Sequence, residues 1–251
     1  MSPASHANNP WFRISRPNPS ARLRLFCFPH AGGTASLYRL WSQYLSADIE
    51  ICAVQLPGRE NRIHEPPFTE VGDLTQQLMP HIRLYLDKPF AFFGHSMGTI
   101  IAYELAQQLH HQTGQTPTNL LVSGRRAPFL PDLQTPLHTI TSDEALLKEM
   151  QRRYDHTPSA LFEDAELRAL FMPLLRADFK LIETYQYVAR EPLSCPVVAF
   201  GGQDDHNVTQ AELMAWQQMT HCDFDLHVLP GGHFYLEQQI QPLLAIVKGY
   251  L

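Results

Sequence analysis

The stretch "FFGHSMGTII" at residues 92–101 places a serine between two glycines, with apolar runs on both sides. The run Phe90–Gly94 has the length and composition of a buried strand, and Thr99–His110 follows it with a helical period. A G-x-S-x-G sequence between a strand and a helix is typical of a nucleophile elbow, a sharp turn that exposes the serine hydroxyl. The stretch therefore predicts that Ser96 is a nucleophile, against the alternative of a glycine-flanked structural turn.

Apolar segments of strand length alternate with segments of helical period along the rest of the chain. Several apolar segments are continuous, which is typical of parallel strands covered on both faces. The alternation favours a doubly wound, mostly parallel α/β sheet flanked by helices. The predicted strands are Leu23–Phe28, Ile49–Leu56, Phe90–Gly94, Leu120–Gly124, Val197–Gly202 and Phe224–Gly232, and the predicted helices are Ser36–Ser46, Glu70–Leu86, Thr99–His110, Thr209–Thr220 and Leu236–Leu251.

The interval between Gly124 and Pro196 departs from this alternation, because it contains helical period and no convincing strand. Ser142, followed by two acidic residues, is a good helix start. The helical pattern continues with an interruption at Pro173. Since an insertion after a strand's carboxyl end lies over the ligand crevice of such a sheet, we expect a helical lid at about 129–190.

The composition indicates one globular domain. The chain has 251 residues, of which 44% are apolar and 18% charged, and its net charge of −6 gives no reason to expect nucleic acid as a partner. We expect a flexible tail at 1–10 and a single domain at 11–251. The polar N-terminus and the lack of an apolar stretch of about 18 residues predict no membrane association and a cytoplasmic location.

A serine nucleophile on such an elbow requires a base and an acid, in the chain order serine, acid, histidine. His233 fits the base, because it follows the last predicted strand within "LPGGHF" and precedes the last helix. The acid should follow the strand before that one, where "GGQDDHNV" supplies both Asp204 and Asp205. One of them would hold the His233 tautomer that accepts the serine proton. The pattern alone leaves both aspartates open.

Backbone N–H groups at two places can stabilise negative charge beside Ser96. Met97 follows the serine at the N-terminus of the predicted helix, where its free N–H can stabilise negative charge on a substrate oxygen. The second donor should come from the loop after the first strand, "FPHAGGTAS", in which Ala31 precedes two glycines. No H-E-x-x-H, C-x-x-C or G-x-G-x-x-G sequence occurs, so we expect no metal and no dissociable cofactor.

With these residues in place, the chain resembles type II thioesterases, the stand-alone α/β-hydrolases that accompany non-ribosomal peptide and polyketide synthases. The similarity runs from Trp11 to Leu251. It is carried by "QLPGRENRIHEPP", "GHSMG", "LLVSGRRAP", "LLRADFKLIETY" and "LPGGHFYL". The combination of "GHSMG" with "PGRExR" and "RADF" is specific to this group. Vertebrate fatty-acid chain-terminating thioesterases, which act on medium-chain acyl groups, share much of the pattern and remain an alternative.

The resemblance bears on the triad acid. Many bacterial members have "GDxDPxV" followed by a tryptophan, with the second aspartate catalytic. Asp205 fits this register, because Val208 lies three residues and Trp216 eleven residues further on. His206 stands where a proline is usual, which allows a shift of one residue to Asp204. The resemblance therefore favours Asp205 over Asp204.

The resemblance implies a substrate and a reaction. The substrate would be an acyl group held as a thioester on the phosphopantetheine arm of an acyl- or peptidyl-carrier domain, in non-ribosomal peptide, polyketide or siderophore biosynthesis. Ser96 would attack the thioester, the N–H groups of Ala31 and Met97 would hold the oxyanion, and His233 would protonate the leaving thiolate. The expected role is removal of aberrant acyl groups by a monomeric enzyme.

Other functions fit the same pattern. A general carboxylesterase or an acyltransferase would use the same triad, and a non-catalytic hydrolase fold could serve as a binding protein. Six arginines also allow two interpretations. Arg59 and Arg62 are either structural or face a phosphate or the acids of a carrier. The pairs Arg125–Arg126 and Arg152–Arg153 are either solvated charges, which we expect, or contacts for an acidic carrier surface.

Overall fold

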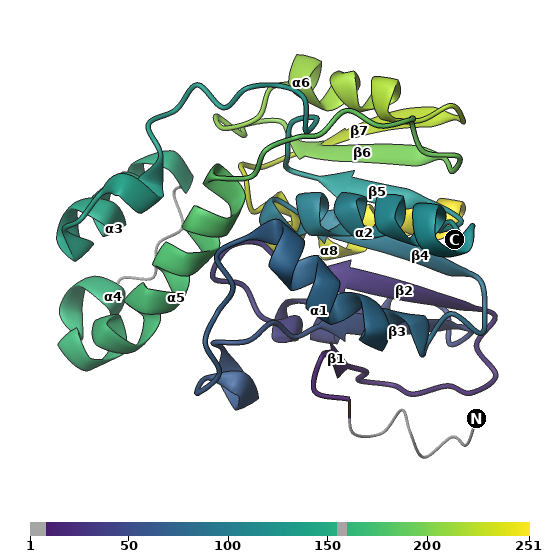
Figure 1. Ribbon diagram of the computed structural model, residues 1–251, viewed down its shortest axis with the longest axis horizontal. Coiled ribbons are helices and arrows are strands. Elements are labelled where there is room, and N and C mark those ends of the chain that lie inside the picture. Colours follow the sequence, from purple (N-terminus) through teal and green to yellow (C-terminus); the bar gives the residue numbers. More distant parts are fainter. Residues whose placement is uncertain (1–8, 155–159) are drawn as a thin grey trace.

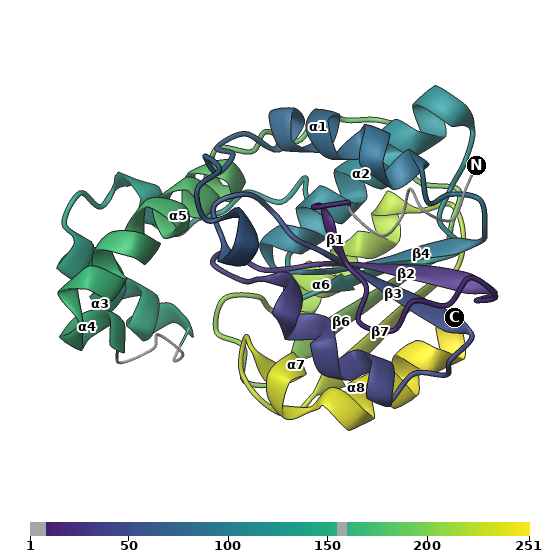
Figure 2. The same cartoon turned by 90° about the horizontal axis from the view of Figure 1, so that it is seen from below.

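A computed structural model describes residues 9–154 and 160–251. Within them, a seven-stranded sheet has the order β1-β3-β2-β4-β5-β6-β7, and helices cover both of its faces (Figures 1 and 2). The first eight residues of the predicted tail at 1–10 lie outside the described residues. The strands are β1 (Phe12–Arg13), β2 (Leu23–Phe28), β3 (Ile49–Val54), β4 (Phe90–His95), β5 (Leu120–Ser123), β6 (Val197–Gly202) and β7 (Phe224–Leu229).

The six neighbouring strands β3-β2-β4-β5-β6-β7 are all parallel. The edge strand β1 is antiparallel to its neighbour β3. The mostly parallel sheet predicted from the sequence is therefore confirmed. The sequence did not indicate β1, because a pair of residues is too short to carry a period. Its register is set by Phe12 opposite Val54 and Arg13 opposite Ala53 at the sheet edge.

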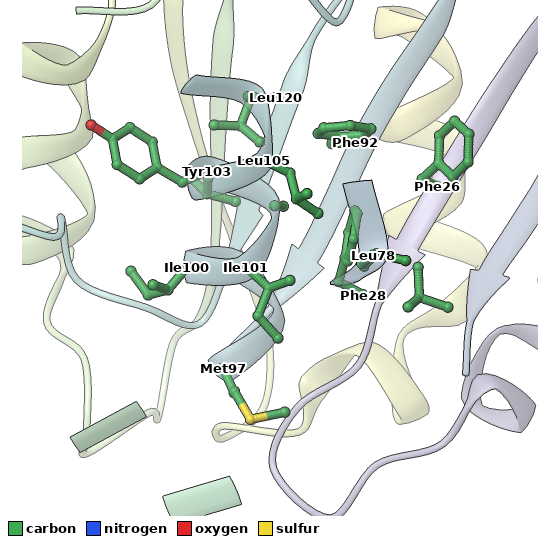
Figure 3. Packing of buried hydrophobic residues seen from close by; sticks show 14 of the residues in the cluster. Phe26, Phe28, Leu78, Phe92, Met97, Ile100, Ile101, Tyr103, Leu105 and Leu120 are labelled. Atoms are coloured by element: carbon green, nitrogen blue, oxygen red, sulfur yellow. The ribbon is translucent and has the colours of Figure 1, made fainter. Parts of the chain in front are cut away.

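Side chains of successive strand residues enter two different cores, which explains why the strands are apolar throughout. In β2, Phe26 and Phe28 pack on the face covered by α1 (Val71–Arg83) and α2 (Met97–Thr113). Leu25 and Cys27 pack on the opposite face, with the C-terminal helices. Figure 3 shows the first core, in which α2 residues Ile101 and Leu105 lie against the phenylalanines of β2 and β4.

Several predicted helices are shorter or tighter than expected. The segment predicted at Ser36–Ser46 is a 3₁₀ helix, Ala35–Gln43. The helix predicted at Leu236–Leu251 divides at Gln239, whose φ of −109° and ψ of 34° lie outside the helical region. The helix predicted at Thr209–Thr220 likewise continues as 3₁₀ after Met214. The elements concerned are α6 (Gln210–Met214), 3₁₀ Ala215–Met219, α7 (Tyr235–Gln238), α8 (Ile240–Val247) and 3₁₀ Lys248–Tyr250; two further 3₁₀ turns span Glu60–Arg62 and Leu137–Thr139.

Between β5 and β6 the chain forms α3 (Asp143–Tyr154), α4 (Ala160–Glu163) and α5 (Ala165–Glu183). We call α3, α4 and α5 the helical segment. It lies beyond the carboxyl ends of the strands, at the left of Figure 1. A small core of its own holds it together, made by buried residues that include Leu146, Leu147, Leu161, Met172 and Phe179. Whether the segment acts as a lid stays a prediction.

The interruption predicted at Pro173 is wrong, because α5 continues through this residue. A proline inside a helix lacks one hydrogen-bond donor. Here Met172 and Leu174, on either side, are buried and keep the helix packed. Among the described residues, no helix is both long enough and apolar enough to cross a membrane.

Candidate active site

Ser96 lies at the turn between β4 and α2, in a backbone conformation that is rare for a residue with a side chain. Its φ is 53° and its ψ is −114°. Such a conformation costs free energy and persists only where the surrounding structure enforces it. The backbone N–H of Ser96 donates to the carbonyl of Ser123 at the end of β5, over 2.8 Å. The turn is thus tied to the neighbouring strand, as expected for a nucleophile elbow.

The two glycines of "GHSMG" are required by close backbone contacts. A Cβ atom at Gly94 would lie 2.4 Å from the carbonyl oxygen of Gly98. A Cβ atom at Gly98 would lie 2.1 Å from the carbonyl oxygen of Phe28, in β2. Neither position has room for a side chain, and the neighbouring atoms belong to backbone that cannot move aside. The contacts hold β2, β4 and α2 together directly beneath Ser96.

His233 and Asp205 meet at the same end of the sheet. His233 follows β7 and Asp205 follows β6, and the His233 Nδ1–H donates to Asp205 Oδ2 over 2.8 Å. Both side chains are buried, with exposed fractions of 4% and 1%. This bond leaves Nε2 of the neutral imidazole free to accept a proton. His233 Nε2 is buried and has no hydrogen-bond partner among the described residues.

The structure separates the two candidate aspartates. Asp205 Oδ1 accepts from the backbone N–H of Asn207 over 2.9 Å, which orients the carboxylate toward His233. Asp204 is exposed, and its backbone N–H donates to the carbonyl of Gly231 over 2.9 Å. Asp204 therefore joins the two loops through its backbone, while the Asp205 side chain contacts the imidazole.

Ser96, His233, Ala31 and Met97 line one cavity of about 60 Å³. One water molecule needs roughly 10–15 Å³ on such a scale, so the cavity has room for a water molecule and a small group together. Neither the Ala31 N–H nor the Met97 N–H has a hydrogen-bond partner within the described ranges. The arrangement combines a nucleophile, a base oriented by an acid, and two amide donors, which is the chemistry of acyl transfer.

The loop that carries Ala31 is fixed by a residue of the helical segment. Asp178, in α5, accepts from the Gly32 N–H over 2.7 Å and pairs with the Arg59 guanidinium, with Nη2 at 2.9 Å from Oδ1. Arg59 also donates to the carbonyl of Gly33 over 2.8 Å. Both charged side chains are 2% exposed. Asp178 and Arg59 therefore hold the loop between them.

This pair escaped the sequence analysis, although both members lie in quoted motifs, "PGRE" and "RADF". The partner of Arg59 is therefore a residue of the same chain. This favours the structural interpretation of Arg59 over contact with a phosphate or a carrier. Arg62 is also buried, and it pairs with Glu65 and lies over the Trp11 ring. The presence of both motifs in one chain was the only sign of this contact in the sequence. Motifs alone do not indicate which of their residues contact each other.

A second histidine lies behind His233. His95 is fully buried, and its Nδ1 is 2.8 Å from the Ser123 hydroxyl, which in turn lies 2.6 Å from the Tyr235 hydroxyl. Its ring centroid is 5.2 Å from that of His233. Burial lowers the pKa of His95 well below its ordinary value, and the charges of His233 and His30 lower it further. His95 is thus a neutral support for the base.

The helical segment supplies one wall of the cavity, through Met150, Tyr154, Phe179 and Ile182. Phe179 lines the cavity, whereas Phe171 and Met172 pack in the core of the helical segment. No group of three potential metal-ligating side chains occurs in the part of the chain that the structure describes.

The expectation that the arginine pairs are solvated is wrong for three of the four residues. Arg126 is 7% exposed and pairs with Asp132 and Glu212. The side chain of Arg153 is 6% exposed and pairs with Glu149. Arg125 lines the cavity, and only Arg152 is a surface charge. Their burial depends on the helical segment and the loop at 131–134, which the local sequence does not reveal.

Comparison with known proteins gives consistent results over nine-tenths or more of the chain. Residues 23–249 match the family described as Thioesterase domain. Gramicidin S biosynthesis protein GrsT of Aneurinibacillus migulanus is 42% identical, over 91% of this chain and 88% of that protein. Thioesterase PikA5 of Streptomyces venezuelae is 39% identical, over 96% and 85%. The structure of the type II thioesterase BorB from the borrelidin biosynthetic cluster superimposes with a TM-score of 0.87 and 36% identity, over 96% and 98%.

Proposed function

Because this chain belongs to the thioesterase domain family, we propose that Ser96, His233 and Asp205 form the triad with which it hydrolyses acyl thioesters on the phosphopantetheine arm of carrier proteins. The observation that carries the proposal is the 2.8 Å bond between His233 and Asp205, at a cavity that Ser96 also lines. The similarity to GrsT and BorB, named for gramicidin S and borrelidin biosynthesis, supports a role in removing acyl groups from non-ribosomal peptide or polyketide synthases.

The first half of the reaction forms an acyl-enzyme. Ser96 Oγ attacks the thioester carbonyl carbon while His233 Nε2 takes the hydroxyl proton, and the Asp205 carboxylate stabilises the resulting imidazolium. The carbonyl oxygen becomes an oxyanion within reach of the Ala31 and Met97 N–H groups. When the carbon–sulfur bond breaks, His233 returns the proton to the departing thiolate. The acyl group is then an ester on Ser96.

The second half releases the acid. A water molecule in the cavity gives a proton to His233 Nε2 and attacks the ester carbonyl. The same two N–H groups hold the second oxyanion. As the ester breaks, Ser96 Oγ regains the proton from His233, and the acyl group leaves as a carboxylic acid. The enzyme ends in its starting state.

The helical segment fits the role of a lid in this proposal. It supplies a wall of the cavity, and it carries Asp178, which binds the loop of the oxyanion donor. An acyl chain too long for this cavity would require this wall to move. The chain would act as a monomer, as the family resemblance implies, and in the cytoplasm, where carrier proteins would meet it.

The proposal is tested with a carrier protein loaded with a short acyl group. The purified protein should release free acid and free carrier thiol in equal amounts, measured by mass spectrometry. A simple oxygen ester of the same acid should react more slowly; equal or faster turnover would favour a general carboxylesterase. Preferred transfer of the acyl group to an added amine would favour an acyltransferase. Medium-chain acyl carriers, run in parallel, test the fatty-acid alternative.

A fluorophosphonate probe separates catalysis from binding. The probe reacts covalently with an activated serine and should label Ser96 in the wild-type protein but not in Ser96→Ala. Labelling should also fall in His233→Ala, because the base that activates the hydroxyl is missing. Absence of labelling in the wild-type protein would instead support a non-catalytic binding protein.

A further inference from the structure

Arg125 lies at the active site but takes no part in the mechanism above. It follows β5 by two residues, and Ser123, the last residue of β5, accepts the backbone N–H of Ser96. The Arg125 carbonyl accepts from Trp216 Nε1 over 2.8 Å, which fixes the backbone there. The Arg125 side chain lines the same cavity as Ser96 and His233. A cation is therefore held next to the reacting groups.

Arg125 forms no direct ion pair within the described residues, although the charges of Asp132 and Glu183 are near enough to act on it. No ion pair or side-chain hydrogen bond forms at its guanidinium, and its Nε is shielded from solvent without a partner. Burial lowers the pKa of Arg125 from its ordinary value. Arg125 as a whole is half-buried, so the cost falls on the shielded part of its guanidinium, which has lost hydration and gained no hydrogen bond in exchange.

The other charges in the cavity wall are already paired. Asp132 Oδ1 lies 2.8 Å from Arg126 Nη1. Glu183 Oε1 accepts from the Leu137 N–H, and its Oε2 accepts from the N–H and the Nδ1 of His138. Arg153, as described above, pairs with Glu149. Neither carboxylate of the wall is thus available to Arg125 in this arrangement.

We propose that Arg125 is a specificity residue that binds a carboxylate on the acyl group itself, so that the enzyme accepts short acyl thioesters carrying a second carboxylate. The proposal rests on the proposed function. A guanidinium and a carboxylate form charge-assisted, often bidentate hydrogen bonds, which are strongest in a cavity that excludes water. The same cation disfavours an acyl group with an ammonium at that position.

The phosphate of the phosphopantetheine arm is another anion, but it is at the opposite end of the arm from the thioester. When the thioester carbonyl is at Ser96, the acyl group occupies the cavity and the phosphate is far along the arm. Arg125 shares its cavity with Ser96 and His233, so it is on the acyl side. This placement favours a carboxylate of the acyl group as the ligand.

The test uses three thioesters with the same branched skeleton and different charge: 2-carboxypropionyl, isobutyryl and alanyl. Each is prepared on two carriers, N-acetylcysteamine, which lacks a phosphate, and phosphopantetheine, which has one. The wild-type protein, Arg125→Gln, Arg125→Lys and the control Arg152→Gln are compared by kcat/KM. Arg152 is a suitable control, because its side chain is 70% exposed and lies outside the cavity wall.

We expect the wild-type protein to prefer 2-carboxypropionyl over isobutyryl, and isobutyryl over alanyl. Arg125→Gln should lower the ratio of kcat/KM for 2-carboxypropionyl to that for isobutyryl by about 10- to 100-fold, the range for a hydrogen-bonded charge pair. Arg125→Lys should keep the order, and Arg152→Gln should leave the ratio unchanged. Turnover of isobutyryl by Arg125→Gln shows that this variant is folded.

Two results would overturn the proposal. One is an unchanged ratio in Arg125→Gln while isobutyryl is still hydrolysed. The other is that Arg125→Gln slows isobutyryl only when it is carried on phosphopantetheine, which would make the phosphate the ligand. If the wild-type protein hydrolyses none of the three thioesters on either carrier, the proposed function itself fails, and that outcome is distinct from both.

Discussion

The carboxyl ends of the strands, which we call the sheet edge below, and the helical segment meet at one cavity. The two regions are held in place by different kinds of contact. At the sheet edge, backbone packs directly on backbone, as where Gly98 lies against the carbonyl of Phe28. The helical segment reaches the rest of the protein through side chains, chiefly Asp178 with Arg59 and the Gly32 N–H, and through apolar side chains in the cavity wall.

The difference separates two tasks. Backbone contacts leave no room for substitution, so they hold the reacting groups in fixed positions. Side-chain contacts can change one residue at a time, so they can adapt the cavity wall to different acyl groups. We therefore expect substitutions at the sheet edge to lower kcat or unfold the protein, and substitutions in the helical segment to change rates more modestly.

Removing the nucleophile should have the largest effect. Ser96→Ala is expected to lower kcat by about 10⁶-fold, since the triad acts as a unit. The melting temperature should stay equal to or above that of the wild-type protein, because alanine also fits the site sterically. Ser194→Ala, at an exposed serine, is the control and should keep full activity. Retention of more than a few per cent of activity in Ser96→Ala would remove Ser96 from the mechanism.

The two neighbouring aspartates should differ strongly. Asp205→Asn is expected to lower kcat by about 10⁴-fold, because an amide in this place can favour the wrong tautomer of His233. Asp204→Asn, at an exposed side chain, should change kcat by less than about twofold. Steady-state kinetics of both variants provides the measurement. The reverse ranking would move the triad acid to Asp204.

A methyl group at the sheet edge should test the backbone contact directly. Gly98→Ala is expected to lower the free energy of unfolding by about 3 kcal/mol or more, because its Cβ would overlap the Phe28 carbonyl. Gly72→Ala is the matched control, since it lies in α1 with no atom within 4 Å of the added Cβ. That control should stabilise the protein by up to about 1 kcal/mol. Urea denaturation measures both, and equal stabilities would contradict the required contact.

The smallest expected effect on kcat among the site residues is at the side-chain contact of the helical segment. Asp178→Asn should lower kcat by about tenfold with KM little changed, because the loop of Ala31 loses one charge-assisted hydrogen bond and shifts slightly. It should also destabilise the protein by about 3 kcal/mol, since Arg59 stays buried without its partner.

Asp143→Asn is the control for this prediction, because Asp143 pairs with Arg176 at a half-exposed site, unlike the fully buried Asp178–Arg59 pair. It should cost less than about 1 kcal/mol and leave kcat unchanged. A tenfold loss of kcat in both variants would show that the helical segment acts through its general stability. A larger loss in Asp178→Asn than in Asp205→Asn would reverse the comparison between the two regions.

The sequence predicted the parts of this protein that carry a period or an ordered motif. The type II thioesterase family and the mostly parallel sheet are confirmed, and the structure brings Ser96, Asp205 and His233 to one edge of the sheet. These features follow from alternation of strands and helices and from chain order, both of which are local or one-dimensional properties. The roles of the site residues remain a prediction until they are measured.

Contacts between distant segments were not predictable in the same way. Arg59 and Asp178 are 119 residues apart, and no period links them. The burial of Arg126 and of the Arg153 side chain depends on which segments close over them, so a local pattern of two arginines suggests a solvated surface. Pro173 indicated a helix end, whereas packing of its neighbours overrides the local preference.

The Arg59–Asp178 contact also sets a rule for recombination between homologous enzymes. The helical segment has a core of its own and enters the domain at two points, so it resembles an exchangeable cassette for transplanting acyl preference. Its aspartate, however, completes a loop that belongs to the recipient. A chimera should therefore take the arginine and the aspartate from the same parent, because a crossover at the start of the helical segment, between Arg59 and Asp178, would separate them.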